Sequence, residues 1–363
     1  MDHQGGIVLA ATVAEGVSGM GAPNGMDAIR VASDACSPIL IELDTDKNWT
    51  EARKEELNTT AALVRGVCAC FARQGVGIHG FDLQLTSNLP VGGGMSSSAA
   101  VECLIGCMVN ALFAQDRISP QDIARFGLEA EVNWFGKPCG ILDQSAIMAG
   151  GISALNFSNR ELPYIRPVRF SFEDHGYAVC LIDVGKSHSD ATADFASIPD
   201  DMCAAARHFG KNVLGEVDET DFFGGFDQLR TDLGDRIALR ALHFFREREL
   251  VKRRISALEA GDIDAYLAAT RASGRSSSDY LQNISASPDS QPAMVALALA
   301  DLILDGKGAF RIHGGGFGGS IQAYVPIGLI DSFCERMDRH MGTGACRLLQ
   351  LGGQGAHILR EHI

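Results

Sequence analysis

The sequence predicts an α+β protein with two hydrophobic cores, on three observations. The chain has 363 residues, of which 46% are hydrophobic and 21% charged, and a chain of this length commonly divides into two domains. Residues 81–113 have the pattern of a strand, a glycine-rich loop and a buried helix. Residues 310–341 have the pattern of two strands around a second glycine-rich loop and a final helix, an order typical of α+β domains. We place the domain boundary near residue 175, which gives domains over residues 1–175 and 176–363.

In the N-terminal part, apolar or alternating runs predict strands at residues 6–13, 39–43 and 81–86. Asn58-Thr59-Thr60 supplies an N-cap for a helix that follows it. Residues 101–113 contain no proline and predict a buried helix. Ser119 followed by Pro120 predicts the start of a helix that ends near Trp134.

In the C-terminal part, apolar runs predict strands at residues 152–156, 177–183, 310–313 and 321–325. Helical periodicity predicts helices at residues 236–258, 262–272 and 329–341. The polar stretch 185–201 between them predicts a loop.

The charge and cysteine content restrict the class of partner. Thirty-one basic against 45 acidic side chains give a formal net charge of −14, a field that repels nucleic acid and anionic lipid. No apolar run is long enough for a membrane span. The ten cysteines occur without a C-x-x-C spacing, which favours reduced, buried thiols. We therefore expect a cytoplasmic protein, a monomer or weak homo-oligomer, whose partners are small molecules.

The most informative segment is the run of Gly92, Gly93 and Gly94 that precedes Met95 and three serines. Consecutive glycines let backbone N–H groups converge, and the following helix points its positive end at the same place. We expect an anion there, with the hydroxyl of one of the residues Ser96, Ser97 and Ser98 as a ligand for Mg²⁺. The alternative is a glycine-rich turn with serine caps. The segment does not match a Walker loop.

Residues 314–319 match the pattern G-x-G-x-x-G of dinucleotide-binding proteins. We reject a dinucleotide site, because a strand rather than a helix is predicted after Gly319 and too few residues remain for a doubly wound half. We expect instead a β-turn-β loop whose backbone presses against the first glycine segment. A purely structural hairpin is the alternative.

Between the two loops, Glu131 is followed twelve residues later by Asp143. A single aspartate in an apolar, glycine-flanked turn is costly to bury without a partner, which makes Asp143 a candidate functional residue. It could equally cap the next helix. Phosphoryl transfer requires a phosphate cradle, a metal and a group that receives a proton, and these segments together could supply all three.

Three motifs together resemble those of a known family. Residues 90–100 (Pro-Val-Gly-Gly-Gly-Met-Ser-Ser-Ser-Ala-Ala), 139–144 (Cys-Gly-Ile-Leu-Asp-Gln) and 314–319 (Gly-Gly-Gly-Phe-Gly-Gly) resemble the second, middle and third motifs of galactokinases, within the GHMP kinase superfamily. The three motifs occur in the right order over about 230 residues. Residues 2–9 also resemble the end of the galactokinase N-terminal signature, so the resemblance extends over nearly the whole chain.

The resemblance implies a GHMP kinase fold, with an N-terminal domain like ribosomal S5 domain 2, a ferredoxin-like C-terminal domain, and ATP and sugar in the cleft between them. It implies that Asp143 is the catalytic residue, that Ser98 and Glu131 hold Mg²⁺, and that the sugar contacts Asp2, Gly140, Asp143 and Phe195. The ATP-binding residues that it implies are Gly92, Gly93, Gly94, Met95, Ser96, Ser97, Ser98, Gly315 and Gly316.

The sequence departs from the galactokinase pattern in two places. Galactokinases carry an arginine-bearing strand upstream of the position that matches Asp2, and here Met1 stands where that run ends. We therefore expect a chain that lacks its first strand and has weak activity, because such an arginine offsets charge on the transferred phosphoryl group. Phe195 stands where typical galactokinases have a tyrosine, which removes one hydroxyl from the sugar site.

The sequence thus predicts ATP-dependent phosphorylation of a monosaccharide at its anomeric hydroxyl, with galactose as the first candidate. A kinase for arabinose, galacturonate or N-acetylgalactosamine is one alternative. A catalytically silent relative that binds ATP and sugar as a sensor is another, which the intact Asp143 disfavours and Phe195 favours.

Overall fold

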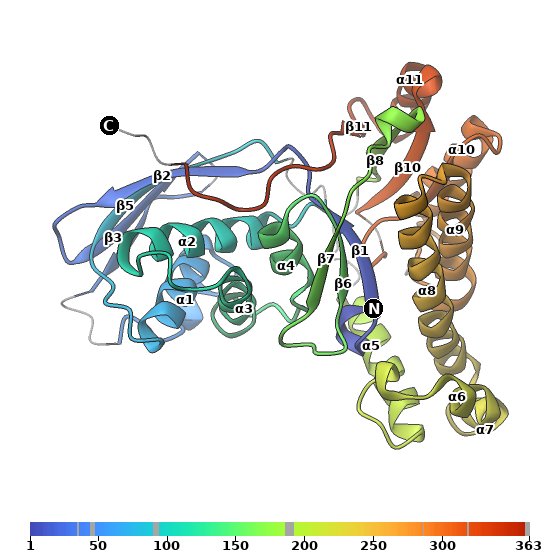
Figure 1. Cartoon of the computed structure of the whole chain (residues 1–363), viewed down its shortest axis with the longest axis horizontal. Coiled ribbons are helices and arrows are strands. Elements are labelled where there is room, and N and C mark those ends of the chain that lie inside the picture. Colours follow the sequence, from blue (N-terminus) through green and yellow to red (C-terminus); the bar gives the residue numbers. More distant parts are fainter. Residues whose placement is uncertain are drawn as a thin grey trace. The chain divides into compact units, whose positions relative to one another are not determined.

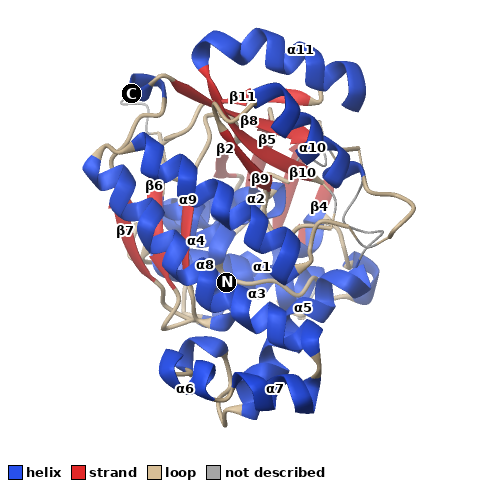
Figure 2. Cartoon of the chain, turned by 90° about the vertical axis from the view of Figure 1, so that its right-hand side faces the viewer, coloured by secondary structure: helices blue, strands red, loops and turns tan. Residues whose placement is uncertain are grey.

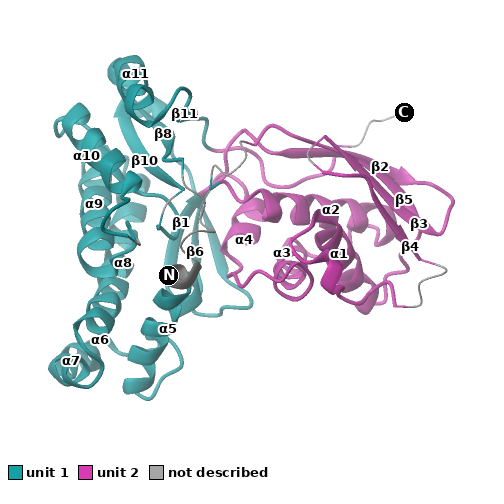
Figure 3. Cartoon of the chain, turned by 180° about the vertical axis from the view of Figure 1, so that it is seen from behind, with its two compact units in different colours: residues 1–10, 91–94, 152–351 teal, residues 11–90, 95–151, 352–363 magenta. Residues whose placement is uncertain are grey.

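The computed structural model describes residues 1–34, 36–43, 48–89, 94–185, 192–285, 287–317 and 319–359, without the side chains of residues 192–195. The chain divides into two compact units, each built from separate stretches of sequence (Figure 3). Unit 1 contains Met1–Ala10, Val91–Gly94 and Ile152–Leu351, and unit 2 contains Ala11–Pro90, Met95–Gly151 and Gly352–Ile363. Among the described residues, no helix is both long and apolar enough to cross a membrane.

Unit 2 contains a four-stranded sheet with helices on one face (Figure 1). The strand order is β2 (Val17–Pro23), β5 (Phe81–Ser87), β3 (Ala28–Ser33) and β4 (Ile39–Glu42). Only the pairing of β3 with β5 is parallel. The helices are α1 (Thr60–Arg73), α2 (Ser97–Phe113), α3 (Pro120–Ala130) and α4 (Leu142–Ala149), and the 3₁₀ turn Lys54–Glu56 precedes α1. Side chains from α1, α2 and α3 fill one core with the inward residues of the sheet.

Local sequence signals place the helices of unit 2 as predicted. The Thr59 hydroxyl accepts a hydrogen bond from the Ala62 backbone N–H and caps α1, and the Ser119 hydroxyl does the same for Asp122 in α3. The helix that begins at Pro120 changes to a π-helical turn over Glu131–Phe135 and ends at Gly136, whose φ of 88° stops it.

Unit 1 contains two sheets. The four-stranded sheet has the order β11 (Cys346–Leu349), β8 (Tyr177–Asp183), β10 (Ser320–Pro326) and β9 (Ala309–Ile312), with all pairs antiparallel. The three-stranded sheet has the order β1 (Ile7–Ala11), β6 (Ile152–Asn156) and β7 (Tyr164–Val168). A 3₁₀ turn, Asp2–Gln4, precedes β1, and two others cover Glu173–His175 and Ile327–Leu329.

Helices cover both faces of the four-stranded sheet (Figure 2). On one face, Cys180, Ile182 and Ile321 share a core with α10 (Pro292–Leu304) and α11 (Ile330–Met341). On the other face, the Tyr324 hydroxyl of β10 meets the Tyr266 hydroxyl of α9 (Ile263–Ser276) at 2.7 Å. The sheet is therefore the middle layer of unit 1.

The remaining helices of unit 1 form a second core. They are α5 (Thr192–His208), α6 (Glu219–Gly224), α7 (Phe226–Leu233) and α8 (Asp235–Ala260), with a 3₁₀ turn at Leu214–Glu216 and a π-helical turn at Ser277–Leu281 after α9. A buried ion pair joins this layer to β9, because Glu247 accepts hydrogen bonds from Arg254 at 2.5 Å and from Arg311 at 3.4 Å. Burial would raise the pKa of Glu247, but the charges of Arg254 and Arg311 lower it to about 2.

The loop predicted at residues 185–201 is wrong over its second half, where α5 begins at Thr192. Residues 186–191 lie outside the described part of the chain. The polar sequence and Pro199 disfavour a helix locally, yet Ile198 and Met202 are buried in the core that α5 shares with α8. Tertiary burial therefore outweighs the local signal.

Strands β2, β3, β7 and β11 and helices α6, α7 and α10 were not predicted. In β2, Gly19 and Gly21 weaken the strand pattern. A Cβ at Gly21 would lie 2.3 Å from Met108 Sδ of α2, so the Met108 side chain occupies the space that the glycine leaves on this strand.

The compact units are not separated at residue 175, because residues 152–175 belong to the same unit as residues 176–351. A domain boundary near residue 175 stays a prediction.

Candidate active site

The N-terminal end of α2 has backbone N–H groups that could bind an anion. Ser96, the N-cap, has φ 50° and ψ 55°, a left-handed conformation that residues other than glycine seldom adopt. Its side chain makes no capping hydrogen bond to α2 and instead donates to Asp143 Oδ2. The N–H groups of the first turn are thus not capped by Ser96, and they carry the positive end of the helix dipole.

Asp143 lies in the first turn of α4, and Figure 1 shows α4 beside α2 in unit 2. The Asp143 side chain is exposed, so the argument from the cost of burial does not hold. The N-cap of α4 is Ile141 rather than Asp143. The structural support for a functional role of Asp143 is its hydrogen bond with Ser96. This hydrogen bond holds the Asp143 carboxylate at the N-terminal end of α2.

Glu131, in the π-helical turn after α3, is buried and accepts four side-chain hydrogen bonds. The donors and their distances are Ser98 Oγ at 2.8 Å, Lys137 Nζ at 2.8 Å, Gln144 Nε2 at 3.0 Å and Cys139 Sγ at 3.2 Å. Burial would raise the pKa of Glu131, but the hydrogen bonds and the charge of Lys137 outweigh it and hold the pKa below its ordinary value. Glu131 is therefore an ionised carboxylate.

A second buried carboxyl group lies next to the first. Gln144 Nε2 donates to Glu102 Oε2 of α2 at 2.9 Å as well as to Glu131 Oε2. Burial and then the negative charge of Glu131 raise the pKa of Glu102 to about 8, although the Gln144 hydrogen bond lowers it. Near neutral pH Glu102 is therefore protonated, and the two carboxyl groups together carry one negative charge.

The same contacts fix the position of Asp143. Gln144 is the next residue along α4, and its amide is hydrogen-bonded to carboxyl groups of α2 and of the turn after α3. A Cβ at Gly127 of α3 would lie 3.1 Å from both Gln144 Cγ and Glu102 Oε2, so the helices pack closely at this crossing. Three helices thus orient the carboxylate that Ser96 contacts.

The residues present fit Mg²⁺. Ser98 and Glu131 offer a hydroxyl and a carboxylate, the oxygen ligands that Mg²⁺ prefers, and octahedral Mg–O bonds of about 2.1 Å place adjacent ligand oxygens about 2.9 Å apart. The Ser98 Oγ to Glu131 Oε1 distance is 2.8 Å. Lys137, whose side chain is 55% exposed, supplies the positive charge beside Oε1 in this structure and is free to turn toward solvent when a cation binds.

The second glycine segment is a tight loop between β9 and β10, as predicted, and no helix follows it directly. Asn283 holds the loop, because its Nδ2 donates to the Gly315 carbonyl at 3.0 Å and its carbonyl accepts from the Phe317 N–H at 2.6 Å. Gly316 has φ 85°, and a Cβ there would lie 2.1 Å from the Asn283 carbonyl oxygen. Only glycine fits at this position.

The first glycine segment reaches the strands on either side of that loop. A Cβ at Gly94 would lie 3.0 Å from Ser320 Oγ and 3.5 Å from His313 Cδ2, which flank residues 314–319. The described structure thus places Gly94 beside side chains that flank the second glycine segment, within unit 1. Gly92 and Gly93 lie outside the described residues.

The other predicted site residues lie on several elements of the two units. Asp2 lies in the 3₁₀ turn before β1, and its carboxylate is 3.8 Å from the N-terminal amine. Gly140 is half-buried in the turn before α4, and Met95 and Ser97 flank Ser96. Phe195 lies in α5, and its side chain is outside the described part.

Four residues of this site were not expected from the sequence to have a role: Glu102, Lys137, Cys139 and Gln144. Glu102 could have been noticed as a charge in an otherwise apolar helix. Lys137, Cys139 and Gln144 belong to the turn and helix that carry Asp143, but only the fold of that turn shows that they face Glu131.

Comparison with known proteins places this arrangement in a family. Residues 62–151 match the sequence model described as the GHMP kinases N terminal domain. That range contains Ser96, Ser98, Glu131 and Asp143. Residues 62–151 are thus similar to the N-terminal domain of GHMP kinases, and the chain is similar to galactokinases over most of its length.

Curated relatives extend the match over most of the chain. A galactokinase of Clostridium acetobutylicum is 27% identical over 349 residues, which is 92% of this chain and 83% of the relative. A galactokinase of Actinobacillus pleuropneumoniae is 29% identical over 285 residues, which is 77% of this chain and 72% of the relative.

Solved structures match the whole GHMP kinase fold. The crystal structure of Lactococcus lactis galactokinase in complex with galactose has a TM-score of 0.83 and 22% identity, and the match covers 99% of this chain and 91% of that one. A mevalonate kinase structure has a TM-score of 0.62 and 13% identity, and the match covers 95% and 93% of the two chains. These likenesses establish the GHMP kinase fold that the sequence predicts.

Proposed function

We propose that this protein is an ATP-dependent sugar kinase that phosphorylates the anomeric hydroxyl of a monosaccharide, with galactose as the first candidate. One observation carries the proposal: the Ser98–Glu131 pair and the Ser96–Asp143 pair meet at the uncapped N-terminal end of α2. The relatives that are named galactokinases support the choice of sugar.

In this proposal the phosphates of ATP bind at the first glycine segment. Residues 92–98 and the first-turn N–H groups of α2 donate to phosphate oxygens, an arrangement common at helix N-termini. Gly315 and Gly316 stabilise the segment from the second glycine loop. Ser98 and Glu131 hold Mg²⁺, which when bound offsets negative charge on the transferred phosphoryl group.

Asp143 is the catalytic residue of the proposal, and it accepts or orients the proton of the anomeric hydroxyl. The Ser96 hydroxyl donates a hydrogen bond to this carboxylate. Asp2, Gly140 and Phe195 contact the other sugar groups. Because phenylalanine has no hydroxyl, arabinose, galacturonate and N-acetylgalactosamine belong among the sugars that must be tested.

The test is ATP-dependent turnover by the purified protein across a panel of hexoses, pentoses and uronic acids, with the product identified by phosphorus NMR as a 1-phosphate. Asp143→Asn removes the proton acceptor and keeps the size, so we expect a loss of turnover of about a hundredfold or more. Asp264→Asn is the matched control, since Asp264 is an exposed aspartate in the first turn of another helix, α9.

Full turnover by Asp143→Asn would contradict the role of this carboxylate. Binding of ATP and sugar by the unaltered protein without any product would contradict the kinase and favour a sensor.

A further inference from the structure

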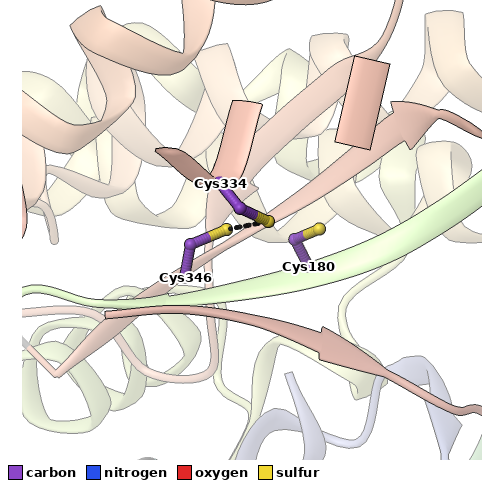
Figure 4. Close-up of side chains that lie close together, drawn as sticks. All are labelled: Cys180, Cys334 and Cys346. Atoms are coloured by element: carbon purple, nitrogen blue, oxygen red, sulfur yellow. Dashed lines mark hydrogen bonds between the residues drawn. The ribbon is translucent and has the colours of Figure 1, made fainter. Parts of the chain in front are cut away.

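Three cysteine thiols from distant parts of the chain converge in unit 1 (Figure 4). Cys180 lies on β8, Cys334 on α11 and Cys346 on β11. Their Sγ atoms lie within 4.8 Å of one another, and the Cys346 thiol donates a hydrogen bond to Cys334 Sγ at 3.0 Å. All three are free cysteines.

The strand register accounts for two of the three positions. In the antiparallel pairing of β11 with β8, Cys346 is opposite Ile182, and Leu348 is opposite Cys180. Cys346 and Cys180 are therefore diagonal neighbours whose side chains lie on the same face of the sheet.

Helix α11 brings the third thiol to that face. Phe333 and Met337 of α11 are buried in the core to which Cys180 also belongs. Cys334 and Asp338 are one turn apart on α11, and the Asp338 carboxylate accepts hydrogen bonds from the backbone N–H groups of Gly344 and Cys346, each at 2.8 Å. The helix thus holds the start of β11, and the sulfur atoms are positioned by regular elements rather than by flexible loops.

We propose that Cys180, Cys334 and Cys346 form a binding site for one thiophilic cation, with Zn²⁺ as the first candidate. Three sulfur ligands select soft or borderline cations over Mg²⁺. Zn–S bonds of about 2.3 Å in a tetrahedral arrangement place the sulfur atoms about 3.8 Å apart. The shortest observed separation, 3.0 Å, and the upper bound, 4.8 Å, lie on either side of that value.

Binding exchanges three thiol protons for one divalent cation, because zinc binds thiolates. The fourth ligand position is open to water, since Cys334 and Cys346 are only half-buried while Cys180 is buried. The cation would tie α11 and the edge strand β11 to β8. None of the three cysteines is among the residues that the proposed function assigns to ATP, Mg²⁺ or the sugar.

In the first test, the reduced protein is titrated with Cd²⁺ as a probe. Binding is measured from the thiolate-to-metal absorption band in the ultraviolet. We expect saturation at one Cd²⁺ per chain, and binding at least tenfold weaker in Cys334→Ser and in Cys346→Ser. Cys36→Ser is the control, because Cys36 is a half-buried thiol outside the cluster, and it should bind as the unaltered protein does.

The second test needs no variant, so a serine variant that fails to fold does not decide the matter. Alkylation of the native protein with and without Zn²⁺, read by peptide mass spectrometry, should show protection of the half-buried Cys334 and Cys346 beyond that of the half-buried Cys36, Cys139 and Cys203. Absence of saturable Cd²⁺ binding, equal binding by Cys334→Ser, or a Zn²⁺ effect on alkylation that does not favour Cys334 and Cys346 would overturn the proposal.

Discussion

At the scale of single residues, the candidate active site depends on an unequal pair of buried carboxyl groups. Glu131 is ionised because hydrogen bonds and Lys137 outweigh burial, whereas Glu102 is neutral because burial and the charge of Glu131 dominate. Gln144 bridges the two groups. This division leaves one negative charge where a cation is to be held and avoids the cost of a second buried one.

The neutral state of Glu102 predicts a distinct pH dependence of stability. The folded pKa of about 8 lies above the unfolded one, so the folded state holds a proton that the unfolded state has lost between about pH 4.5 and pH 8. The contribution of Glu102 to the free energy of unfolding is therefore largest at low pH. It falls as pH rises through this window, by at most about 1.4 kcal/mol per pH unit. The substitution Glu102→Gln removes the ionisable group and with it this pH dependence.

Urea unfolding at pH 5.5 and pH 8.5 measures this effect. We expect Glu102→Gln to gain stability relative to the unaltered protein as pH rises, while Glu55→Gln, at an exposed glutamate, shows no such change. A constant difference between Glu102→Gln and the unaltered protein over this range would mean that Glu102 is ionised throughout.

At the scale of elements, glycines allow the helices of unit 2 to approach closely enough to build the site. Gly66 of α1 faces the end of α3, where a Cβ would lie 2.7 Å from Ala130 Cβ and 2.9 Å from Ala130 Cα. Ala130 directly precedes Glu131. The contact between α1 and α3 therefore fixes the backbone that carries the buried carboxylate.

Gly66→Ala should destabilise the protein although alanine favours a helix. The gain in helix propensity is about 1 kcal/mol, but the new methyl group meets backbone and Cβ atoms that cannot rotate away, and overpacking costs about 1–3 kcal/mol. We expect a net loss of about 1 kcal/mol in unfolding free energy, together with lower kinase activity.

Gly224→Ala is the matched control, because a Cβ at Gly224 of α6 has no neighbour within 4 Å. Its unfolding free energy should be unchanged or slightly higher. If the two substitutions have the same effect, the contact between α1 and α3 is not as tight as described.

Elements with strong local signals could be predicted from the sequence. The caps at Thr59 and Ser119 and the alternation of Phe81, Leu83 and Leu85 determine where α1, α3 and β5 lie. Strand β2 and helix α5 could not be predicted in this way. Gly21 of β2 is selected by the approach of Met108, and the core around α8 buries Ile198 and Met202 despite Pro199.

At the scale of the whole molecule, each compact unit is assembled from segments that are distant in sequence. Unit 2 includes the segment from Gly352, where the Gly353 carbonyl accepts a hydrogen bond from the Thr12 hydroxyl at 2.6 Å. Gly150 and Gly355 approach so closely that a Cβ at Gly150 would lie 2.3 Å from the Gly355 nitrogen. Such contacts join the C-terminal segment to the rest of unit 2, and no local sequence pattern predicts them.

The same distinction applies to the site. The motifs around Ser98 and Asp143 could be identified locally because they are contiguous, and they point to phosphate and metal chemistry. The contacts of Lys137 and Gln144 with Glu131 depend on how α3, its π-helical turn and α4 fold together. The thiol cluster depends on strand register and helix placement, so a sequence pattern could not reveal it.

The central claim is that Mg²⁺ and the triphosphate of ATP meet at Glu131 and Ser98. Calorimetric titration of the protein with ATP, in the presence of either Mg²⁺ or EDTA, tests this claim. The proteins compared are the unaltered protein, Glu131→Gln and the control Glu129→Gln. Glu129 is a suitable control because it forms an ion pair with Arg73 and does not contact Glu131 or Ser98 in the described structure. We predict that Mg²⁺ strengthens ATP binding about tenfold or more in the unaltered protein and in the control, and has almost no effect in Glu131→Gln. An undiminished effect of Mg²⁺ in a folded Glu131→Gln protein would contradict the account.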